Sequence, residues 1–133
     1  MTGIRCTHLD HCSVLITDVA AARRFYGETL GLKEIAPPAT FDFVALWFQL
    51  GHGTLHLLRK DKPDTRSPRH FCLHVEDITS VRTYLTGNGV PLEETVKIPG
   101  CDRFFVYDPD GNRIEILQWE RPYDPARDGR FSA

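Results

Sequence analysis

The chain has 133 residues, the length of one ordinary domain or of two small folding units that share a core. Hydrophobic residues make up 41% and charged residues 26%, a composition that excludes disordered, collagen-like and disulfide-dense proteins. The net charge is −2 without runs of like charge, so we expect no nucleic acid partner and no membrane partner. No apolar run approaches the roughly twenty residues of a membrane span, and residues 1–5 do not resemble a signal peptide. We expect a cytoplasmic protein.

The sequence repeats itself at a constant offset of 59 residues. The aligned positions are His11 with His70, Asp18 with Asp77, Arg23 with Arg82, and the triplet Leu55-His56-Leu57 with Ile114-Glu115-Ile116. No gap is needed between the two ends of the match. The repeat therefore predicts two copies of one supersecondary unit.

The first copy begins with an apolar, β-branched stretch at 12–17 that predicts a buried strand. Asp18 is a good N-cap for the helical stripe that follows, and Gly31 stands where the helix should end. Further strands are predicted at 41–50 and 54–59, with a Gly-His-Gly turn between them.

The second copy follows the same order. A strand is predicted at 71–76, and Asp77 caps a helix that stops at 87–89. Strands are then expected at 92–97, 103–107 and 113–119. The fold class is thus α+β, with a strand, a helix and up to three more strands in each half.

The predicted organisation is one domain made of two modules, at about 5–60 and about 69–122. Residues 61–68, with two prolines and alternating charge, are the expected linker. Residues 123–133 form a polar tail that we expect on the surface.

Four metal-capable residues occupy corresponding strands of the two copies. His11 and His70 lie on the opening strands, and His56 and Glu115 on the last strands, each on the face that alternation turns away from the helix. Two or three imidazoles and a carboxylate suit Zn, Ni, Co, Mn or Fe(II). Taken singly, each histidine is better explained as a hydrogen-bonded strand residue and Glu115 as a solvent-facing one. The repeat favours the metal site, because it places metal-capable residues at both ends of both copies. His74 lies about 13 Å along the strand from His70, so the two cannot share one ion.

The chain resembles the vicinal oxygen chelate superfamily, which includes glyoxalases, bleomycin-resistance proteins and ring-cleaving dioxygenases. The resemblance extends from Leu9 to about Trp119. Its motifs are Leu9-Asp10-His11 with Thr17-Asp18-Val19, Arg24-Phe25-Tyr26 with Leu30-Gly31-Leu32, His70-Phe71 with Val75-Glu76-Asp77, and the run from Tyr107 to Glu115.

The resemblance implies two tandem βαβββ modules that form a cupped, mostly antiparallel sheet around a divalent metal. It implies His11, His56, His70 and Glu115 as ligands, a small-molecule substrate and a homodimer. The shared chemistry is chelation of two neighbouring substrate oxygens, which stabilises an oxyanion or enediolate.

Two positions depart from well-known members. His56 stands where glyoxalase I has glutamate and methylmalonyl-CoA epimerase has glutamine. Phe105 stands where a ring-cleaving dioxygenase has tyrosine.

The expected function is that of a glyoxalase-like lyase or isomerase. Glu115 and His56 are the candidate catalytic residues, and His56 is either a fourth ligand or a proton shuttle. Arg103 and Phe105 are candidates for substrate binding, although Arg103 equally fits a solvent-facing strand end. Two alternatives stay open: an Fe(II)-dependent dioxygenase, and a non-catalytic small-molecule binder of the antibiotic-resistance type. Trp47 and Phe43 either line the pocket or pack in the core.

Overall fold

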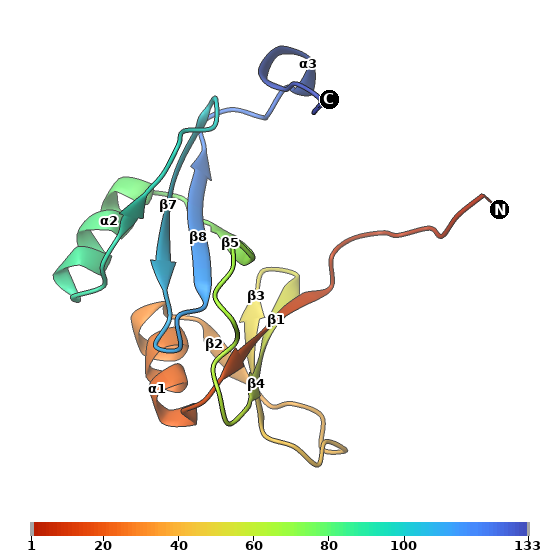
Figure 1. The fold of residues 1–133 in the computed structure, drawn as a ribbon, viewed down its shortest axis with the longest axis vertical. Helices are drawn as coiled ribbons and strands as arrows, with labels where there is room; N and C mark the ends of the chain where they lie inside the picture. The colour runs from red at the N-terminus through yellow and green to blue at the C-terminus, as the bar shows by residue number, and fades with distance from the viewer. Residues whose placement is uncertain (1, 133) are drawn as a thin grey trace. The chain divides into compact units, whose positions relative to one another are not determined.

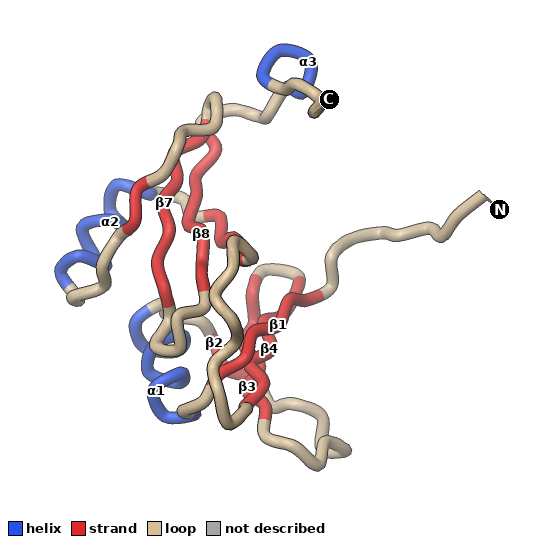
Figure 2. The backbone as a smooth tube through the Cα atoms, in the orientation of Figure 1, coloured by secondary structure: helices blue, strands red, loops and turns tan. Residues whose placement is uncertain are grey.

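The chain divides into two units between Thr65 and Arg66. The structure is a computed structural model that describes residues 2–132. The division falls within the predicted linker 61–68, which contains neither helix nor strand (Figure 2). No helix within the described range is long and apolar enough to cross a membrane.

The first unit contains a four-stranded mixed sheet. Its elements in chain order are β1 (His11–Ile16), α1 (Val19–Arg23), a π-helical turn η1 (Arg24–Thr29), β2 (Lys33–Ile35), β3 (Ala45–Leu50) and β4 (Gly53–Arg59). The strand order is β1-β4-β3-β2. Strands β1 and β4 are parallel, and the other two pairs are antiparallel.

The second unit repeats this topology. It contains β5 (His70–His74), α2 (Ile78–Gly87), β6 (Glu93–Glu94), β7 (Cys101–Tyr107), β8 (Arg113–Trp119) and a short terminal helix α3 (Pro125–Asp128). The strand order is β5-β8-β7-β6, with β5 and β8 parallel (Figure 1). The α+β class, the βαβββ order of each module and the mostly antiparallel pairing are therefore confirmed.

Both main helices begin at the predicted caps. The side chain of Asp18 accepts a hydrogen bond from the backbone of Ala21 at 3.0 Å. Asp77 accepts one from the backbone of Ser80 at 3.1 Å and another from its hydroxyl at 2.6 Å. These bonds satisfy amide groups that have no partner in the first turn of a helix, which is why the sequence signal was reliable.

Each sheet has one apolar face, which packs beneath the helix of its own unit. In the first unit Tyr26, Phe48 and Leu57 are fully buried, and in the second Phe104 and Ile114 are. Burial of one such side chain contributes roughly 1.5–3 kcal/mol to the stability of the fold. The apolar residues therefore determine which face of each strand packs against the helix. The residues of alternate parity, including all the predicted site residues, lie on the other face.

Some predicted boundaries were wrong. The strand expected at 41–50 begins at Ala45, and Phe41 and Phe43 before it stack on each other with ring centroids 4.5 Å apart. The strand expected at 92–97 contains only Glu93–Glu94. Strand β2 was not predicted, because three residues with two charges give no periodic signal. The tail contains α3, which begins at the N-cap Asp124.

Candidate functional site

The first unit brings together two of the predicted ligands. The rings of His11 on β1 and His56 on β4 are stacked, with centroids 4.1 Å apart and planes 19° apart. The parallel pairing of the strands sets His11 opposite Thr54 and Ser13 opposite His56, so the two histidines are diagonal neighbours on one face. The repeat placed them on that face, and the register brings them into contact.

Asp10 fixes the orientation of the His11 ring. Nδ1 of His11 donates to a carboxylate oxygen of Asp10 over 2.8 Å. This hydrogen bond lowers the pKa of the Asp10 carboxyl, which therefore stays ionised at neutral pH. Because the proton is held on Nδ1, the lone pair of a neutral His11 is on Nε2.

His56 lies in the middle of a stack of three rings. Trp47 of β3 covers its other face, with centroids 3.8 Å apart and planes 6° apart. A hydrogen bond of 2.7 Å joins Nε2 of His56 to the hydroxyl of Thr54. Burial lowers the pKa of the His56 imidazole, as does its proximity to His11, so the ring is neutral at neutral pH.

The stacking of the two histidine rings in the first unit limits how they can bind a metal ion. A lone pair of imidazole lies in the plane of its ring, and the planes of His11 and His56 are nearly parallel. In this arrangement the two rings do not direct lone pairs at one common point. Joint coordination of one ion by both would require one ring to leave the stack.

In the second unit, His70 and Glu115 are in contact. Nδ1 of His70 donates to the backbone carbonyl of Pro68 over 2.8 Å, and Nε2 lies 3.1 Å from Oε2 of Glu115. A carbonyl only accepts, so the proton of a neutral His70 is on Nδ1. The lone pair on Nε2 then faces a carboxylate oxygen, which is unfavourable unless a second proton or a cation lies between them.

The other oxygen of Glu115 is paired with Arg103. Nη1 of Arg103 donates to Oε1 over 3.0 Å, and Nε donates to the carbonyl of Val96 over 2.9 Å. The Glu115 side chain is only 8% exposed and that of Arg103 16%. Arg103 thus neutralises a buried carboxylate, and its role as a substrate anchor stays a prediction.

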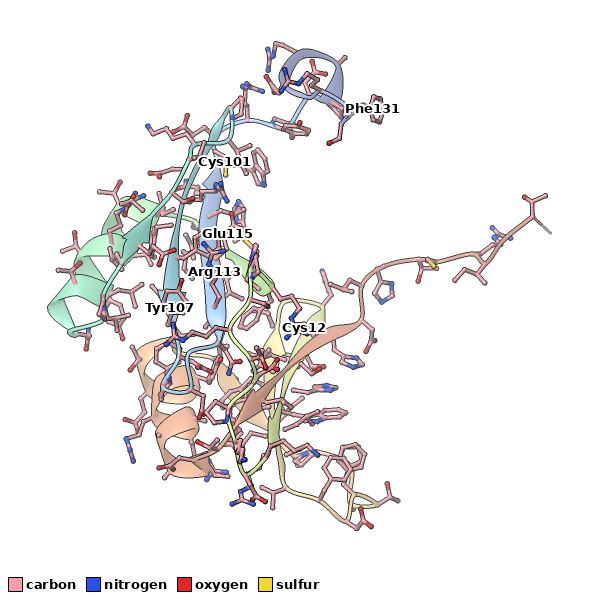
Figure 3. The ribbon with its side chains drawn as sticks, in the orientation of Figure 1. Cys12, Cys101, Tyr107, Arg113, Glu115 and Phe131 are labelled. Carbon is pink, nitrogen blue, oxygen red and sulfur yellow. The ribbon has the colours of Figure 1, made fainter. Side chains whose placement is uncertain are left out.

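Phe105 forms the aromatic floor of the same face. Its ring meets His70 edge-on at 5.0 Å between centroids, and the guanidinium carbon of Arg113 lies 3.6 Å from its centroid. Figure 3 shows Glu115, Arg113 and Tyr107 in succession along β8 and β7. Phe105 therefore supports both the histidine and the arginine through its two contacts.

The remaining polar residues of β5 make other contacts. Partial burial and the negative charge of Glu115 raise the pKa of the Cys72 thiol to about 12, so it stays protonated at neutral pH. Nε2 of His74 accepts from the backbone of Trp119 at 3.4 Å. His74 thus contacts a backbone amide, and the assignment of His70 to the site stays a prediction.

The donor set fits a divalent metal. Ligand bonds of about 2.0–2.2 Å that meet at tetrahedral or octahedral angles put two donors about 3 Å apart. The 3.1 Å between His70 and Glu115 matches this separation. In addition, His11 and His70 each hold their second nitrogen on an oxygen acceptor, the usual support for a histidine that binds metal. Within residues 2–132 the structure forms no group of three or more His, Cys, Asp or Glu side chains around one point.

The sequence did not predict several participants. Asp10 directly precedes His11, so this adjacency could have indicated its role. Thr54 lies two residues before His56, so alternation places both on the same face of the strand. Arg113 shares parity with Glu115, but the sequence analysis gave it no role. Trp47 lies on the site face against His56, while Phe43 is half exposed and stacks only on Phe41.

The fold and the site define a protein of two βαβββ modules whose opening and closing strands carry histidine and carboxylate side chains on one face. Residues 8–116 match the sequence profile of the Glyoxalase/Bleomycin resistance protein/Dioxygenase superfamily. The chain belongs to this superfamily.

Individual relatives agree with this assignment. The chain is 30% identical over 125 residues to "Glyoxylase I 4" of Arabidopsis thaliana, covering 85% of this chain and 71% of the relative. A glyoxalase family protein from Bacillus anthracis is 28% identical with a TM-score of 0.82, covering 89% of this chain and 99% of that one. An antibiotic binding protein from Streptomyces sp. CB03234 shares the fold, with 21% identity, a TM-score of 0.70, and coverage of 88% and 99%.

Proposed function

We propose that the protein is a divalent-metal-dependent lyase or isomerase of glyoxalase type, acting on a small substrate with neighbouring oxygens. The observation that carries the proposal is the pair His70 and Glu115, whose facing atoms at 3.1 Å need a proton or a cation between them and match the spacing of two metal ligands. The relationship to "Glyoxylase I 4" at 30% identity supports the same class of reaction.

His11, His70 and Glu115 are the proposed ligands. Asp10 and the Pro68 carbonyl hold the two imidazoles in the tautomer that leaves Nε2 available. When bound, the ion would polarise two neighbouring oxygens of a substrate and stabilise negative charge on them. Zn, Ni, Co, Mn and Fe(II) all suit this donor set.

His56 is proposed as a proton shuttle rather than a fourth ligand. Its ring is stacked between Trp47 and His11, so its plane does not converge with that of His11 on a common ion. The hydroxyl of Thr54 is hydrogen-bonded to Nε2 and holds the ring in its orientation. Removal of a proton next to a carbonyl and its return to the neighbouring carbon is the step that this ring would serve.

The test is metal content by elemental analysis of protein purified without a histidine tag. We expect about one transition metal per chain, and its loss in a His70→Ala, Glu115→Ala double variant. His74→Ala is the matched control, since His74 lies on the same strand and the same face but binds a backbone amide. This control should retain the metal.

A wild-type protein that cannot be loaded with Zn, Ni, Mn or Fe(II) would overturn the proposal and leave a small-molecule binder of the same fold. If metal is bound, turnover of a thiohemiacetal without oxygen uptake supports the lyase or isomerase. Oxygen uptake by the Fe(II)-loaded protein would instead establish the dioxygenase alternative.

A further inference from the structure

A second site lies at one end of the sheet of the second unit. A cavity of about 350 Å³ is lined by Arg66, Ser67, Pro68, Tyr107, Gly111 and Arg113. Two of these six residues carry a positive charge, and none carries a negative one. We propose that this cavity binds the carboxylate or phosphate group of a small anionic ligand.

Arg66 supplies the available charge. Its guanidinium carbon lies 5.6 Å from the centroid of the Tyr107 ring. Gly111, with φ of +83°, leaves room for it, because a Cβ there would lie 3.1 Å from Nη2 of Arg66. Within residues 2–132 no carboxylate accepts a hydrogen bond from Arg66, so its N–H groups are available to a ligand.

Arg113 supplies the second charge and is held rigidly. Its guanidinium lies on the Phe105 ring at 3.6 Å, and Nη2 donates to Glu93 over 3.2 Å. Nε of Arg113 is buried and has no hydrogen-bond partner among residues 2–132. Glu93 also accepts from the hydroxyl of Tyr107 at 2.9 Å, so its one negative charge is shared between two donors.

The side chains that line the cavity carry two positive charges and no negative one. Beyond the lining, Glu93 pairs with Arg113. The nearby Asp108 uses its carboxylate within its own turn, where it accepts from Asp110 and Asn112. An anion with two or three oxygens matches the donors of paired guanidinium groups better than a neutral ligand does.

The site lies beside the proposed metal ligands. Arg113 is the register partner of His70, and Glu115 is two residues further along the same face of β8, about 7 Å away. An anionic group held by the arginines would thus project the rest of a small molecule toward His70 and Glu115. This link to the reaction rests on the proposed function, whereas anion binding itself requires no metal.

The experiment is a titration of the metal-free full-length protein, followed by NMR of the arginine Nε–H signals and by calorimetry. Benzoate and phenyl phosphate are the anionic probes, and benzamide is the neutral analogue of similar shape. We expect one of the two anions to bind at least tenfold more tightly than benzamide and to shift the Arg66 and Arg113 signals. The preferred anion identifies the ligand group as carboxylate or phosphate.

Arg66→Gln is the decisive variant, because Arg66 makes no hydrogen bond that the fold needs. We expect it to weaken anion binding at least tenfold, while Lys62→Gln, an equal charge change in the linker, leaves binding unchanged. Equal binding of benzoate, phenyl phosphate and benzamide, or unchanged binding in Arg66→Gln, would overturn the proposal. Because the protein is free of metal throughout, failure of the metal site would not alter either result.

Discussion

Arg103 and Glu115 form an ion pair of 3.0 Å on the face that carries the candidate metal ligands, and His70 lies 3.1 Å from the second oxygen of the same carboxylate. Both partners of the ion pair are largely buried. A carboxylate in this position needs compensation, and Arg103 supplies it whether or not a metal is bound. The arginine and the metal would therefore stabilise the same negative charge.

Replacement of Arg103 tests this relationship. Arg103→Met should lower the free energy of unfolding of the metal-free protein by about 3 kcal/mol, because it leaves a buried carboxylate with one partner. Added Zn²⁺ should restore more stability to the variant than to the wild type, since ligand binding to the folded state stabilises it. Urea unfolding with and without Zn²⁺ measures both effects. An equal response to Zn²⁺ in the two proteins would contradict a shared role.

Asp10 should act through His11. Asp10→Asn removes the carboxylate that holds the His11 ring, and we expect metal affinity to fall by about 10- to 100-fold. Competition with a chromophoric chelator measures the affinity. Asp61→Asn is the control, because Asp61 is an exposed acid that pairs with Arg59. If the metal affinity of Asp10→Asn equals that of the wild type, the Asp10–His11 hydrogen bond does not support metal binding.

One variant distinguishes a proton-transfer role of His56 from a role as metal ligand. His56→Ala should keep the metal content of the wild type while turnover falls by roughly 10²- to 10⁴-fold, the usual contribution of a positioned proton-transfer group. Elemental analysis and a rate assay on the same preparation test both parts. Loss of metal from His56→Ala would instead make His56 a ligand.

The repeat offers a matched pair of stability variants. Arg82 of α2 donates to both Asp102 and Glu94 and lies over the Phe104 ring at 4.9 Å, whereas among residues 2–132 its counterpart Arg23 forms ion pairs with Glu34 alone. We expect Arg82→Met to cost about 2 kcal/mol and Arg23→Met less than about 1 kcal/mol. Chemical unfolding of both variants provides the comparison, and equal losses would contradict the expectation.

The ion pair between Arg82 and Asp102 makes the stability of the protein depend on pH. The bond from Arg82 lowers the pKa of Asp102 below its ordinary value of 3.8. The carboxylate therefore contributes stability above that value, and the contribution is lost as the pH falls through the depressed pKa. Wild-type protein should lose this part of its stability in acid, and Arg82→Met should lack it. Unfolding curves between pH 2 and about 6 distinguish the two proteins.

Gly53 controls the beginning of β1. A Cβ at this position would lie 2.6 Å from the backbone oxygen of Asp10, so Gly53→Ala should displace the residue before His11. We expect a loss of about 2 kcal/mol and weaker metal binding. Gly51→Ala is the control: φ of +56° makes it strained by about 1 kcal/mol, but nothing lies near its Cβ. Thermal unfolding and a metal titration separate the two effects.

Much of this architecture was predictable from the sequence, because it depends on local rules. The offset of 59 residues predicted two copies of one unit, and Asp18 and Asp77 marked the helix starts that the structure confirms. Alternation along β4 and β8 placed His56 and Glu115 on the face away from the helices. A strand has a period of two residues, so one apolar face fixes the direction of every side chain on it.

The partners of those side chains were decided by tertiary structure. Alternation along a strand predicts the face on which a side chain lies, but not its rotamer or its neighbours on other strands. It therefore did not indicate that His56 stacks between Trp47 and His11. Nor did it indicate that Arg103 pairs with Glu115. The approach of Arg66 to Tyr107 joins residues far apart in the chain. Such contacts depend on strand register and close packing, which arise only when distant segments share one sheet face. The sequence by itself determined the repeat and the faces, and the folded structure determined which charges and rings meet on them.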